Sequence, residues 1–445
     1  MPVSRGARTA ALLALAFGLG ACGSLPPTAP RAPWFETEPD LAAKAERISA
    51  DTLARVDPAG LLLYHAWDPL TDPLNQLRSH DLADAPAWQG YLLAAVAFEE
   101  AVSGADRDAE IRRLAGGLGR FYEVTGVRGL FGRSMIADYA GPRLEWMVDE
   151  AARPTRFWMQ GPTGAWWRNG LAKAHLTLAC FGCAMPLMLE RRGDLGLEPG
   201  TRRALLDVLL PAVHHLASSG FRIRDWDGRF TEFGDLSPQG LNGFNMVCVL
   251  SLLASAAPYD PVLAALYEDK LEKWGPAVAW SLGALGDVMR AVGHAWIGKP
   301  SYSDLQCLAL AAASVFLQEE RAAAVDPLRR GLAGLWPAVR GERNAPFTLC
   351  CAAFVDGGAA ARALEEVLQD LRDFPVAKPI PEHERVATRA VQPLANRPPS
   401  SNYWKSSPYS RVRLPVGEPT GRSYAGQDFL LVYWMGRYLG LVPAR

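Results

Sequence analysis

After its first twenty residues the chain has no long apolar run, and it has no excess of charge of one sign. Without an apolar stretch of about 20 residues, a membrane-spanning helix is not expected in the body of the protein. The 46 Lys and Arg residues nearly match the 47 Asp and Glu residues, so the net charge is -1. No basic run stands out either. The composition therefore argues against a nucleic-acid-binding surface.

Several catalytic motifs are also missing. The sequence contains no Gly-x-Ser-x-Gly elbow, no phosphate-binding loop and no dinucleotide-binding fingerprint. His214 and His215 lie in an expected helix without an acidic partner at ligand spacing, so we expect neither a metal site nor a cofactor. Sustained alternation of β-branched residues is nearly absent, and no strict repeat of about 34 residues marks a helical solenoid.

Cysteine is scarce, with seven residues in 445. Cys180 and Cys183 lie in an apolar helical stretch, where thiols behave as small hydrophobic side chains. We expect the same core role for every cysteine after Cys22, namely Cys180, Cys183, Cys248, Cys307, Cys350 and Cys351. Because their number is even, disulfides in an oxidising compartment are an alternative. Metal or redox chemistry is least favoured, since the Cys-x-x-Cys has no second pair.

The N-terminus carries the clearest motif. Arg5 and Arg8 precede an apolar run over 10–19, which ends in Leu19-Gly20-Ala21-Cys22. A positive region, a short apolar core and a small-residue cleavage site are typical of a secretory signal. The tetrapeptide resembles the lipobox of bacterial lipoproteins, in which the cysteine is acylated and becomes the mature N-terminus. An ordinary signal peptide with an incidental cysteine is the alternative.

The residues after Cys22 predict a tether. Segment 23–30 is rich in proline and should be extended, while several acyl chains would anchor it stably. Gly23, rather than aspartate, after the cysteine resembles lipoproteins of the outer membrane. We therefore expect a signal peptide over 1–21 and a lipidated Cys22 with a tether over 22–36. One domain over 37–445 would then lie in the periplasm or at the cell surface of a bacterium.

Apolar residues of the body recur at spacings of three and four, which is the period of helices. Many of these segments are apolar around most of their circumference, which favours a buried inner layer and an amphipathic outer layer in an all-α fold. By contrast, 374–425 is rich in Pro, Arg and Ser and is expected to be a long irregular loop. The predicted helices span 41–56, 87–102, 111–124, 171–189, 201–218, 240–257, 261–281, 303–317, 327–339, 360–371 and 427–441.

The densest polar and aromatic cluster runs over 222–235 and predicts a β-hairpin around Asp227-Gly228. Asp225 and Asp227 could act as acid and base, with Trp226 as a platform for a sugar ring. The alternative is a tight turn with local hydrogen bonds, followed by a helix that Asn242 caps. A calcium loop is disfavoured because the closing glutamate and other ligand positions are missing.

Several motifs, in this order, resemble a family of uncharacterised bacterial extracytoplasmic proteins. Their toroid of helical hairpins is similar to that of six-hairpin glycosidases and toroid polysaccharide lyases. The resemblance covers about residue 60 to the C-terminus. It is carried by Ser79-His80-Asp81 ahead of Trp88-Gln89-Gly90-Tyr91, Val124-Thr125-Gly126-x-x-Gly129-Leu130-x-x-Arg133, Asp225-x-Asp227-Gly228-x-x-Thr231-x-x-Gly234, Leu241-Asn242-x-x-Asn245 and Asp428-Phe429-Leu430-Leu431-x-Tyr433-Trp434-Met435-Gly436-Arg437-Tyr438.

The resemblance implies a single-domain α/α toroid whose inner helix ends and loops converge on one mouth. Asp227 and Asp81 are the expected acid and base, with Asp225 and His294 as further catalytic candidates. For Asp81 and His294, helix capping and a structural role are the alternatives. Arg133 and Arg168 suit the carboxylates of uronic acids. The expected substrate-binding residues are Trp88, Arg133, Trp166, Trp167, Arg168, Trp226, Asn245, Asp304, Trp404, Tyr409 and Arg437.

The expected function is therefore a membrane-anchored carbohydrate-active enzyme, a glycoside hydrolase that acts on an extracytoplasmic oligo- or polysaccharide. A polysaccharide lyase would depend instead on Tyr409, His294 and the arginines. In place of the acid-rich loop expected from the family, the chain reads Gly161-Pro162-Thr163-Gly164-Ala165-Trp166-Trp167-Arg168. This departure motivates another alternative, a non-catalytic glycan-binding or envelope-assembly lipoprotein. The expected partners are a carbohydrate and a membrane, and the sequence gives no oligomeric state.

Overall fold

The structure is a computed structural model that describes residues 38, 40–63, 65–67, 84–136, 157–292, 302–414, 416–417 and 419–443. Contacts divide the chain into Met1–Arg31 and Ala32–Arg445, and the described residues all belong to the second unit. The predicted signal peptide, Cys22, Asp81 and His294 lie outside the described residues. Among the helices that could be searched, none has the length and apolarity that crossing a membrane requires.

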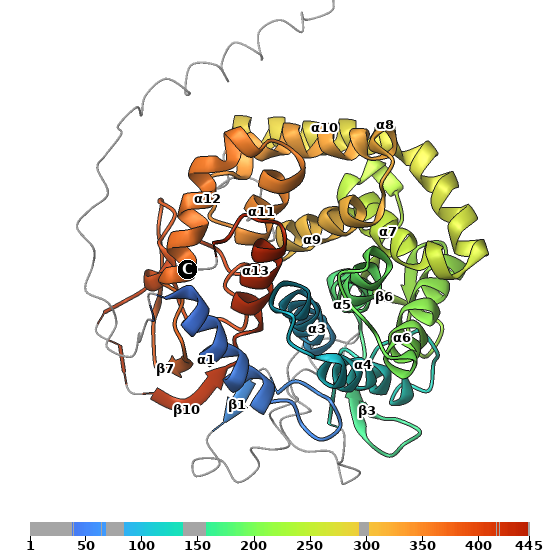
Figure 1. The fold of residues 1–445 in the computed structure, drawn as a ribbon, viewed down its shortest axis with the longest axis horizontal. Helices are drawn as coiled ribbons and strands as arrows, with labels where there is room; N and C mark the ends of the chain where they lie inside the picture. Colours follow the sequence, from blue (N-terminus) through green and yellow to red (C-terminus); the bar gives the residue numbers. More distant parts are fainter. Residues whose placement is uncertain are drawn as a thin grey trace, which may run out of the picture. The chain divides into compact units, whose positions relative to one another are not determined.

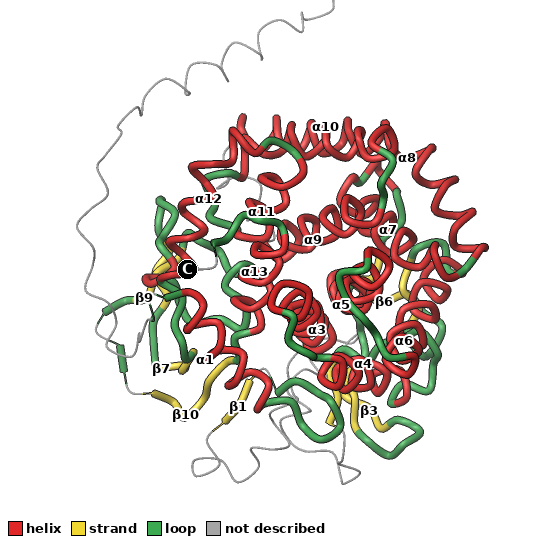
Figure 2. Tube along the Cα trace, viewed as in Figure 1, coloured by secondary structure: helices red, strands yellow, loops and turns green. Residues whose placement is uncertain are grey.

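Most of the described residues are helical, which confirms the predicted all-α class (Figures 1 and 2). The α-helices of the described part are α1 (Leu41–Ala54), α3 (Ala85–Ser103), α4 (Asp108–Glu123), α5 (Lys173–Arg192), α6 (Pro199–Ser218), α7 (Gly243–Ala256), α8 (Pro261–Val292), α9 (Tyr302–Gln318), α10 (Ala322–Val339), α11 (Ala345–Phe354), α12 (Gly357–Arg372) and α13 (Gln427–Tyr438). Short 3-10 helices span Gln239–Leu241, Ala257–Tyr259 and Leu394–Asn396.

Short antiparallel strands form four small sheets at the helix connections. Their orders are β1-β10-β7, β2-β4-β3, β5-β6 and β8-β9. The strands are β1 (His65–Trp67), β2 (Ser134–Ile136), β3 (Trp158–Gln160), β4 (Trp166–Arg168), β5 (Arg222–Arg224), β6 (Phe230–Asp235), β7 (Lys378–Pro381), β8 (Arg385–Ala387), β9 (Ser410–Val412) and β10 (Pro419–Tyr424). The pair β5 and β6 confirms the hairpin predicted around Asp227-Gly228.

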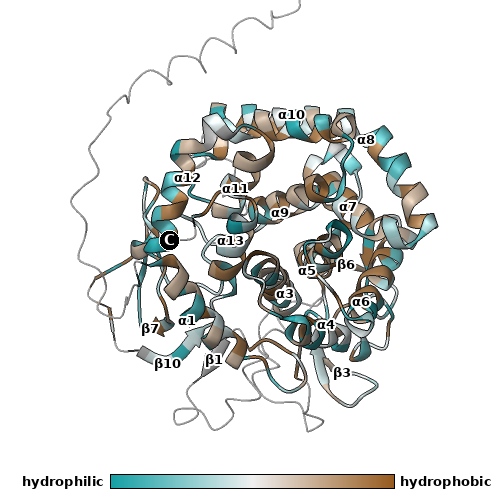
Figure 3. Ribbon diagram, in the orientation of Figure 1, coloured by the Kyte–Doolittle hydropathy of each residue, from teal (hydrophilic) through white to brown (hydrophobic). Residues whose placement is uncertain are grey.

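The helices fall into two sets by burial. Six of them, called here the buried helices, are α3, α5, α7, α9, α11 and α13, and most of their residues are inaccessible to solvent. Helices α1, α4, α6 and α10 bury one face only. In Figure 3, α3, α5 and α9 are largely hydrophobic, whereas α10 and α12 carry many hydrophilic residues. Helices that are apolar around their whole circumference are thus the ones buried on several sides.

Contacts among the buried helices follow chain order. Helix α3 packs against α5, α5 against α7, α7 against α9, α9 against α11, and α11 against α13, which also contacts α3. The remaining helices, α1, α4, α6, α8, α10 and α12, are called the covering helices, and each contacts a buried helix next to it in sequence or, for α1, α13. Figure 1 shows the buried helices inside the covering ones.

The eleven helices predicted from periodicity are all present, and α8 continues beyond its predicted end to Val292. The sequence prediction missed α11, the shortest of the α-helices in the described part. This helix has only ten residues, Pro346 stands in its first turn, and the Asn344 side chain accepts a hydrogen bond from the Phe347 amide at its start. Ten residues are too few for a periodic pattern to stand out.

The prediction of an irregular loop over 374–425 was wrong in part, because this segment contains strands β7, β8, β9 and β10. Two of them form a sheet with β1, which lies more than 300 residues earlier in the chain. Strands of three to six residues with distant partners leave no alternation that a sequence pattern can detect. Tyr403 and Trp404 of this segment are buried, as an ordered segment requires.

The six described cysteines are buried and free, which confirms their predicted role in the core. They lie on α5, α7, α9 and α11, as part of the hydrophobic core. Burial raises the pKa of the thiols of Cys180 and Cys350, so these groups stay protonated and unreactive at neutral pH.

Two adjacent glycines of α4 predict opposite effects on stability. A Cβ at Gly117 would lie 2.1 Å from the Gly60 carbonyl oxygen, whereas a Cβ at Gly116 would meet no atom within 4 Å. We expect Gly117→Ala to lower the free energy of unfolding by about 1–3 kcal/mol through overpacking. Gly116→Ala should raise it by about 0.5–1 kcal/mol through helix propensity. Urea unfolding of both variants checks this, and equal effects would contradict the packing described here.

Candidate functional site

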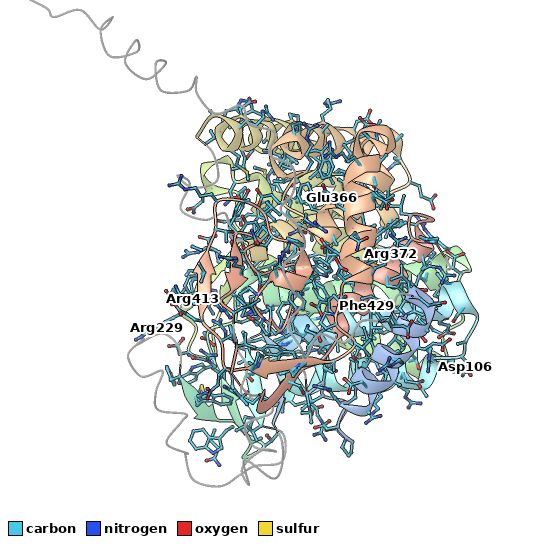
Figure 4. The ribbon with its side chains drawn as sticks, turned by 90° about the vertical axis from the view of Figure 1, so that its left-hand side faces the viewer. Asp106, Arg229, Glu366, Arg372, Arg413 and Phe429 are labelled. Carbon is cyan, nitrogen blue, oxygen red and sulfur yellow. The ribbon has the colours of Figure 1, made fainter. Side chains whose placement is uncertain are left out.

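Side chains at the N-terminal ends of several buried helices contact one another, and we call this group the N-terminal cluster. Side-chain hydrogen bonds join the starts of neighbouring helices there, between Asp84 and His175 and between Lys173 and Asn245. Near the start of α13, Asp428 accepts a hydrogen bond through its carbonyl from the Trp404 indole. In Figure 4, Arg229 and Arg413 lie on one side of the unit, and Asp106, which follows α3, lies on the opposite side.

Asp84 is the centre of the N-terminal cluster. It immediately precedes α3, and its carboxylate is 19% exposed. His175 Nε2 donates a hydrogen bond of 2.7 Å to Asp84 Oδ1, and the Lys405 ammonium pairs with Oδ2. The Lys405 side chain is 32% exposed, so this ion pair lies at the edge of the core and is reachable from solvent.

The surroundings fix the protonation states of Asp84 and His175. Burial alone would raise the pKa of Asp84, but Lys405 and the hydrogen bond from His175 outweigh it and hold that pKa well below its usual range. Burial lowers the pKa of His175, although Asp84 opposes the change. The Ala172 amide donates to His175 Nδ1 over 3.2 Å, so the ring is neutral with its proton on Nε2. At neutral pH the site therefore presents an ionised carboxylate.

A tight turn holds Lys405 in place. Asn402 is fully buried, and its side-chain oxygen accepts the amides of Trp404 and Lys405 over 2.9 and 3.1 Å. The Lys405 ammonium also lies 5.2 Å from the ring centroid of Trp88 on α3. Trp88 was predicted as a sugar-binding residue, and it is buried beneath this ammonium. Its ring supports Lys405 by a cation–π contact.

A second lysine lies at the start of α5. The Lys173 ammonium donates to Asn245 Oδ1 over 3.2 Å and lies 4.5 Å from the ring centroid of Phe244. Asn245 was predicted as a binding residue, but its amide nitrogen donates to the carbonyls of Asp235 and Ser237. Asn242 caps α7 by accepting the Asn245 amide, which confirms its predicted role. Asn245 therefore ties the hairpin strand β6 to α7.

Glu342 is a buried carboxylate near the start of α11. It accepts hydroxyl hydrogen bonds from Tyr302 and Tyr409 over 2.8 and 2.7 Å. Burial, followed by the negative charge of Glu342, raises the pKa of Tyr302, and burial with the hydrogen bond to Glu342 raises the pKa of Tyr409. Tyr409 thus stays a neutral hydroxyl at neutral pH. It is four residues from Lys405, so one segment contacts both Asp84 and Glu342.

Asp304 supplies another carboxylate at this end of the fold. It is partly exposed in the first turn of α9. Gln306, two residues later, accepts a hydrogen bond of 2.7 Å from the Tyr91 hydroxyl on α3. This hydrogen bond joins α3 and α9 within about two turns of their starts, and Asp84 and Asp304 stand at those starts.

The hairpin aspartates accept hydrogen bonds from backbone amides, most of them within the turn. Asp225 accepts the amides of Trp226 and Gly170 over 3.0 and 3.1 Å. Burial raises its pKa, and these backbone hydrogen bonds oppose the rise. Asp227 accepts the Arg229 amide over 2.9 Å, and Gly228 has the positive φ of 79° that this turn needs. These bonds are the ones expected for the structural alternative, and the catalytic role of both residues stays a prediction.

The other predicted site residues divide between the N-terminal cluster and the rest of the fold. Trp167 and Arg168 are buried in the sheet β2-β4-β3, while Trp166 is partly exposed on the same strand. Arg133 is buried and donates to the Gly170 carbonyl over 3.3 Å. It lies close enough to His175 to lower the pKa of that ring further, after burial.

Two further predicted binding residues, Trp404 and Arg437, make contacts within the fold. The Trp404 ring is buried, and its indole nitrogen donates to the Asp428 carbonyl over 2.9 Å. Arg437 lies in the last turn of α13, at the opposite end of that helix, where it donates to the Tyr433 hydroxyl. Trp226, in contrast, is exposed on the hairpin turn.

Sequence reasoning did not find Asp84, His175 or Lys405. His175 and Lys405 are 91 and 321 residues from Asp84, so no local motif could connect them. Asp84 precedes an alanine and a proline that start a helix, so the sequence pattern predicts a capping residue there. His175 lies in the first turn of an apolar helix, where the sequence suggests a buried structural histidine. Only the folded chain brings the three together.

Among the described residues there is no group of three or more His, Cys, Asp or Glu side chains that could hold a metal ion. Comparison with protein-family models, curated proteins and solved structures found no match to this chain.

Proposed function

We propose that the twelve α-helices of the described part form an α/α toroid, with the buried helices as the inner layer and the covering helices as the outer one. Two observations support this architecture. Buried and covering helices alternate along the described chain, and contacts between successive buried helices return from α13 to α3. Since alternating helices point in opposite directions, all inner helices would begin at the same end. The N-terminal cluster would then be the mouth.

At this mouth we propose a glycoside hydrolase site for an extracytoplasmic oligo- or polysaccharide. The observation that carries the proposal is Asp84, a partly exposed carboxylate kept ionised by Lys405 and His175. Residues whose pKa is strongly shifted by a charged partner are frequent at active sites. An anionic carboxylate can act as a nucleophile, or stabilise the oxocarbenium-like charge of the transition state.

The second carboxylate would be Asp304. Because its pKa is held low, Asp84 cannot deliver a proton at neutral pH, so a hydrolase needs a different acid. Asp304 carries a partly exposed carboxyl group at the start of α9, and α9 contacts α3 close to this start. In this scheme Lys405 and His175 orient Asp84 and keep its charge constant, and Asp304 protonates the leaving oxygen.

Lyase chemistry has less support. A lyase of the kind considered from the sequence would use Tyr409 as its base, but burial and Glu342 raise the pKa of this hydroxyl. The hydroxyl also donates to Glu342 over 2.7 Å. A phenol with a raised pKa removes a proton poorly at neutral pH.

One observation favours a second candidate, a non-catalytic glycan-binding or envelope-assembly lipoprotein. Both oxygens of Asp84 already have cationic or hydrogen-bonding partners in the described structure. An ion pair of this kind also occurs as a purely structural contact. For either function, we propose that acylation of Cys22 anchors the protein at the bacterial outer membrane, on the basis of the lipobox resemblance alone.

An activity screen tests the proposed function. The chain from Gly23 onward is incubated with plant, algal and bacterial-envelope polysaccharides, and new reducing ends are measured together with unsaturated-uronate absorbance. We predict new reducing ends without absorbance, as hydrolysis requires. Both signals together would indicate a lyase. Neither signal with any glycan, combined with a ligand-induced rise in melting temperature, would contradict hydrolysis and support the binding protein.

A further inference from the structure

The hairpin β5-β6 exposes three aromatic side chains that neither the acid–base scheme nor the core uses. They are Trp226 in the turn and Phe230 and Phe233 on β6, exposed by 44%, 37% and 44%. The other strongly exposed large apolar side chains of the described residues lie on α8, apart from Leu414. Exposed aromatic rings cost free energy in water, so a group of three on one hairpin calls for an explanation.

The hairpin is fixed to the segment that leads into the N-terminal cluster. The Thr231 hydroxyl donates to the Leu171 carbonyl over 2.8 Å, and Asp225 accepts the Gly170 amide over 3.1 Å. Helix α5, which carries the lysine and histidine of the cluster, follows directly in the sequence. A Cβ at Gly234 would lie 2.0 Å from Thr231 Oγ1, so the strand packs closely at this anchor. The aromatic rings are thus held in place beside the proposed mouth.

Polar groups surround these rings. The guanidinium carbons of Arg222 and Arg224 lie 3.6 and 4.6 Å from the ring centroid of Phe230. Asp227 and Arg229 also belong to the hairpin, and Arg229 is largely exposed. A protein partner would favour a continuous apolar patch, whereas this surface mixes flat rings with hydrogen-bonding groups. Sugar rings offer an apolar face with hydroxyl groups at its edge, and this combination fits the hairpin.

We propose that the hairpin is a subsite for outer sugar units of a polymeric glycan, with Trp226 as its main stacking ring. This inference rests on the proposed function, because the hairpin would hold the part of the chain that extends out of the mouth. A polymer would then bind more tightly than its disaccharide, since only the polymer reaches both places.

Affinity electrophoresis of the chain from Gly23 onward, through gels containing polygalacturonate, alginate or xylan, tests the subsite. We expect the glycan that retards the wild type to bind Trp226→Ala about 5- to 20-fold more weakly, and Trp226→Phe to restore part of the affinity. Trp280→Ala is the matched control, because Trp280 is an exposed tryptophan on α8 and does not belong to the hairpin, and this variant should bind like the wild type. Melting temperatures establish that each variant is folded.

The possible outcomes distinguish failure of the proposed subsite from failure of the proposed function. If the wild type cleaves a glycan while Trp226→Ala and Trp280→Ala are retarded equally, the subsite proposal is wrong. The proposed function is then unaffected. A competing disaccharide should reduce retardation of the wild type only in part, because the polymer also binds the hairpin; complete loss of retardation would contradict the subsite. A wild type that neither cleaves nor is retarded by any of the three glycans would overturn the proposed function and the subsite together.

Discussion

Asp84→Asn is expected to lower turnover of a cleaved glycan by at least about 100-fold, because it removes the negative charge that the proposed hydrolysis depends on. Asparagine keeps the size of the side chain and can still accept the His175 hydrogen bond. It removes the negative charge that Lys405 pairs with, so the loss isolates the role of that charge. The measurement is kcat with the glycan identified by the activity screen, together with the melting temperature.

Asp227→Asn is the matched control for this prediction. Both changes convert an aspartate to asparagine, but Asp227 is exposed on the hairpin turn and its carboxylate accepts the Arg229 amide. We expect Asp227→Asn to keep turnover close to that of the wild type. If Asp227→Asn abolished turnover while Asp84→Asn retained it, the catalytic carboxylate would lie on the hairpin, as the sequence pattern alone indicates.

Asp428→Ala is expected to lower the free energy of unfolding by about 3–5 kcal/mol, because it leaves a buried ammonium without its counter-charge. The Lys378 and Asp428 side chains are 1% and 0% exposed and meet at 2.8 Å. The second Asp428 oxygen accepts the Tyr403 amide over 2.8 Å. Burial lowers the pKa of Lys378 and raises the pKa of Asp428, and their mutual attraction opposes both changes.

This buried pair ties the start of α13 to β7 and to the turn that carries Lys405, so its loss should also lower activity. The control is Asp207→Ala, which breaks the exposed pair between Arg203 and Asp207 on α6. We expect that change to stay within about 0.5 kcal/mol, as surface substitutions usually do. Chemical denaturation of the two variants gives both values. A loss below about 1 kcal/mol for Asp428→Ala would contradict the importance of the buried pair.

Most of the fold could be predicted from sequence because long helices repeat their pattern. Helices such as α3 and α5 are apolar on almost every side, and the burial this indicates is present in the structure. The strands β7 and β10 could not be predicted, because each is short and β10 pairs with residues far away in the chain. The resemblance to the toroid family remains a prediction.

The candidate site could be predicted only in part. The sequence directed attention to residues that are conspicuous locally, such as Asp227 beside Trp226 and Gly228, and these form a turn. The strongly shifted carboxylate is Asp84, whose chemistry depends on two residues from distant segments. Electrostatic coupling of this kind arises from tertiary contacts, so it cannot be recognised in a linear sequence motif. Asp304, named from the sequence, lies at the end of the fold where Asp84 is found.

A crystal structure of the Asp84→Asn variant, soaked with an oligosaccharide of the cleaved glycan, tests the central claim most directly. The account predicts sugar density at the N-terminal ends of α3, α5 and α9, with a glycosidic oxygen between the substituted side chain at position 84 and the Asp304 carboxyl group. That oxygen should lie at hydrogen-bonding distance from the Asp304 carboxyl group. A sugar bound only at the opposite end of the buried helices, or on a surface that excludes both positions, would contradict it.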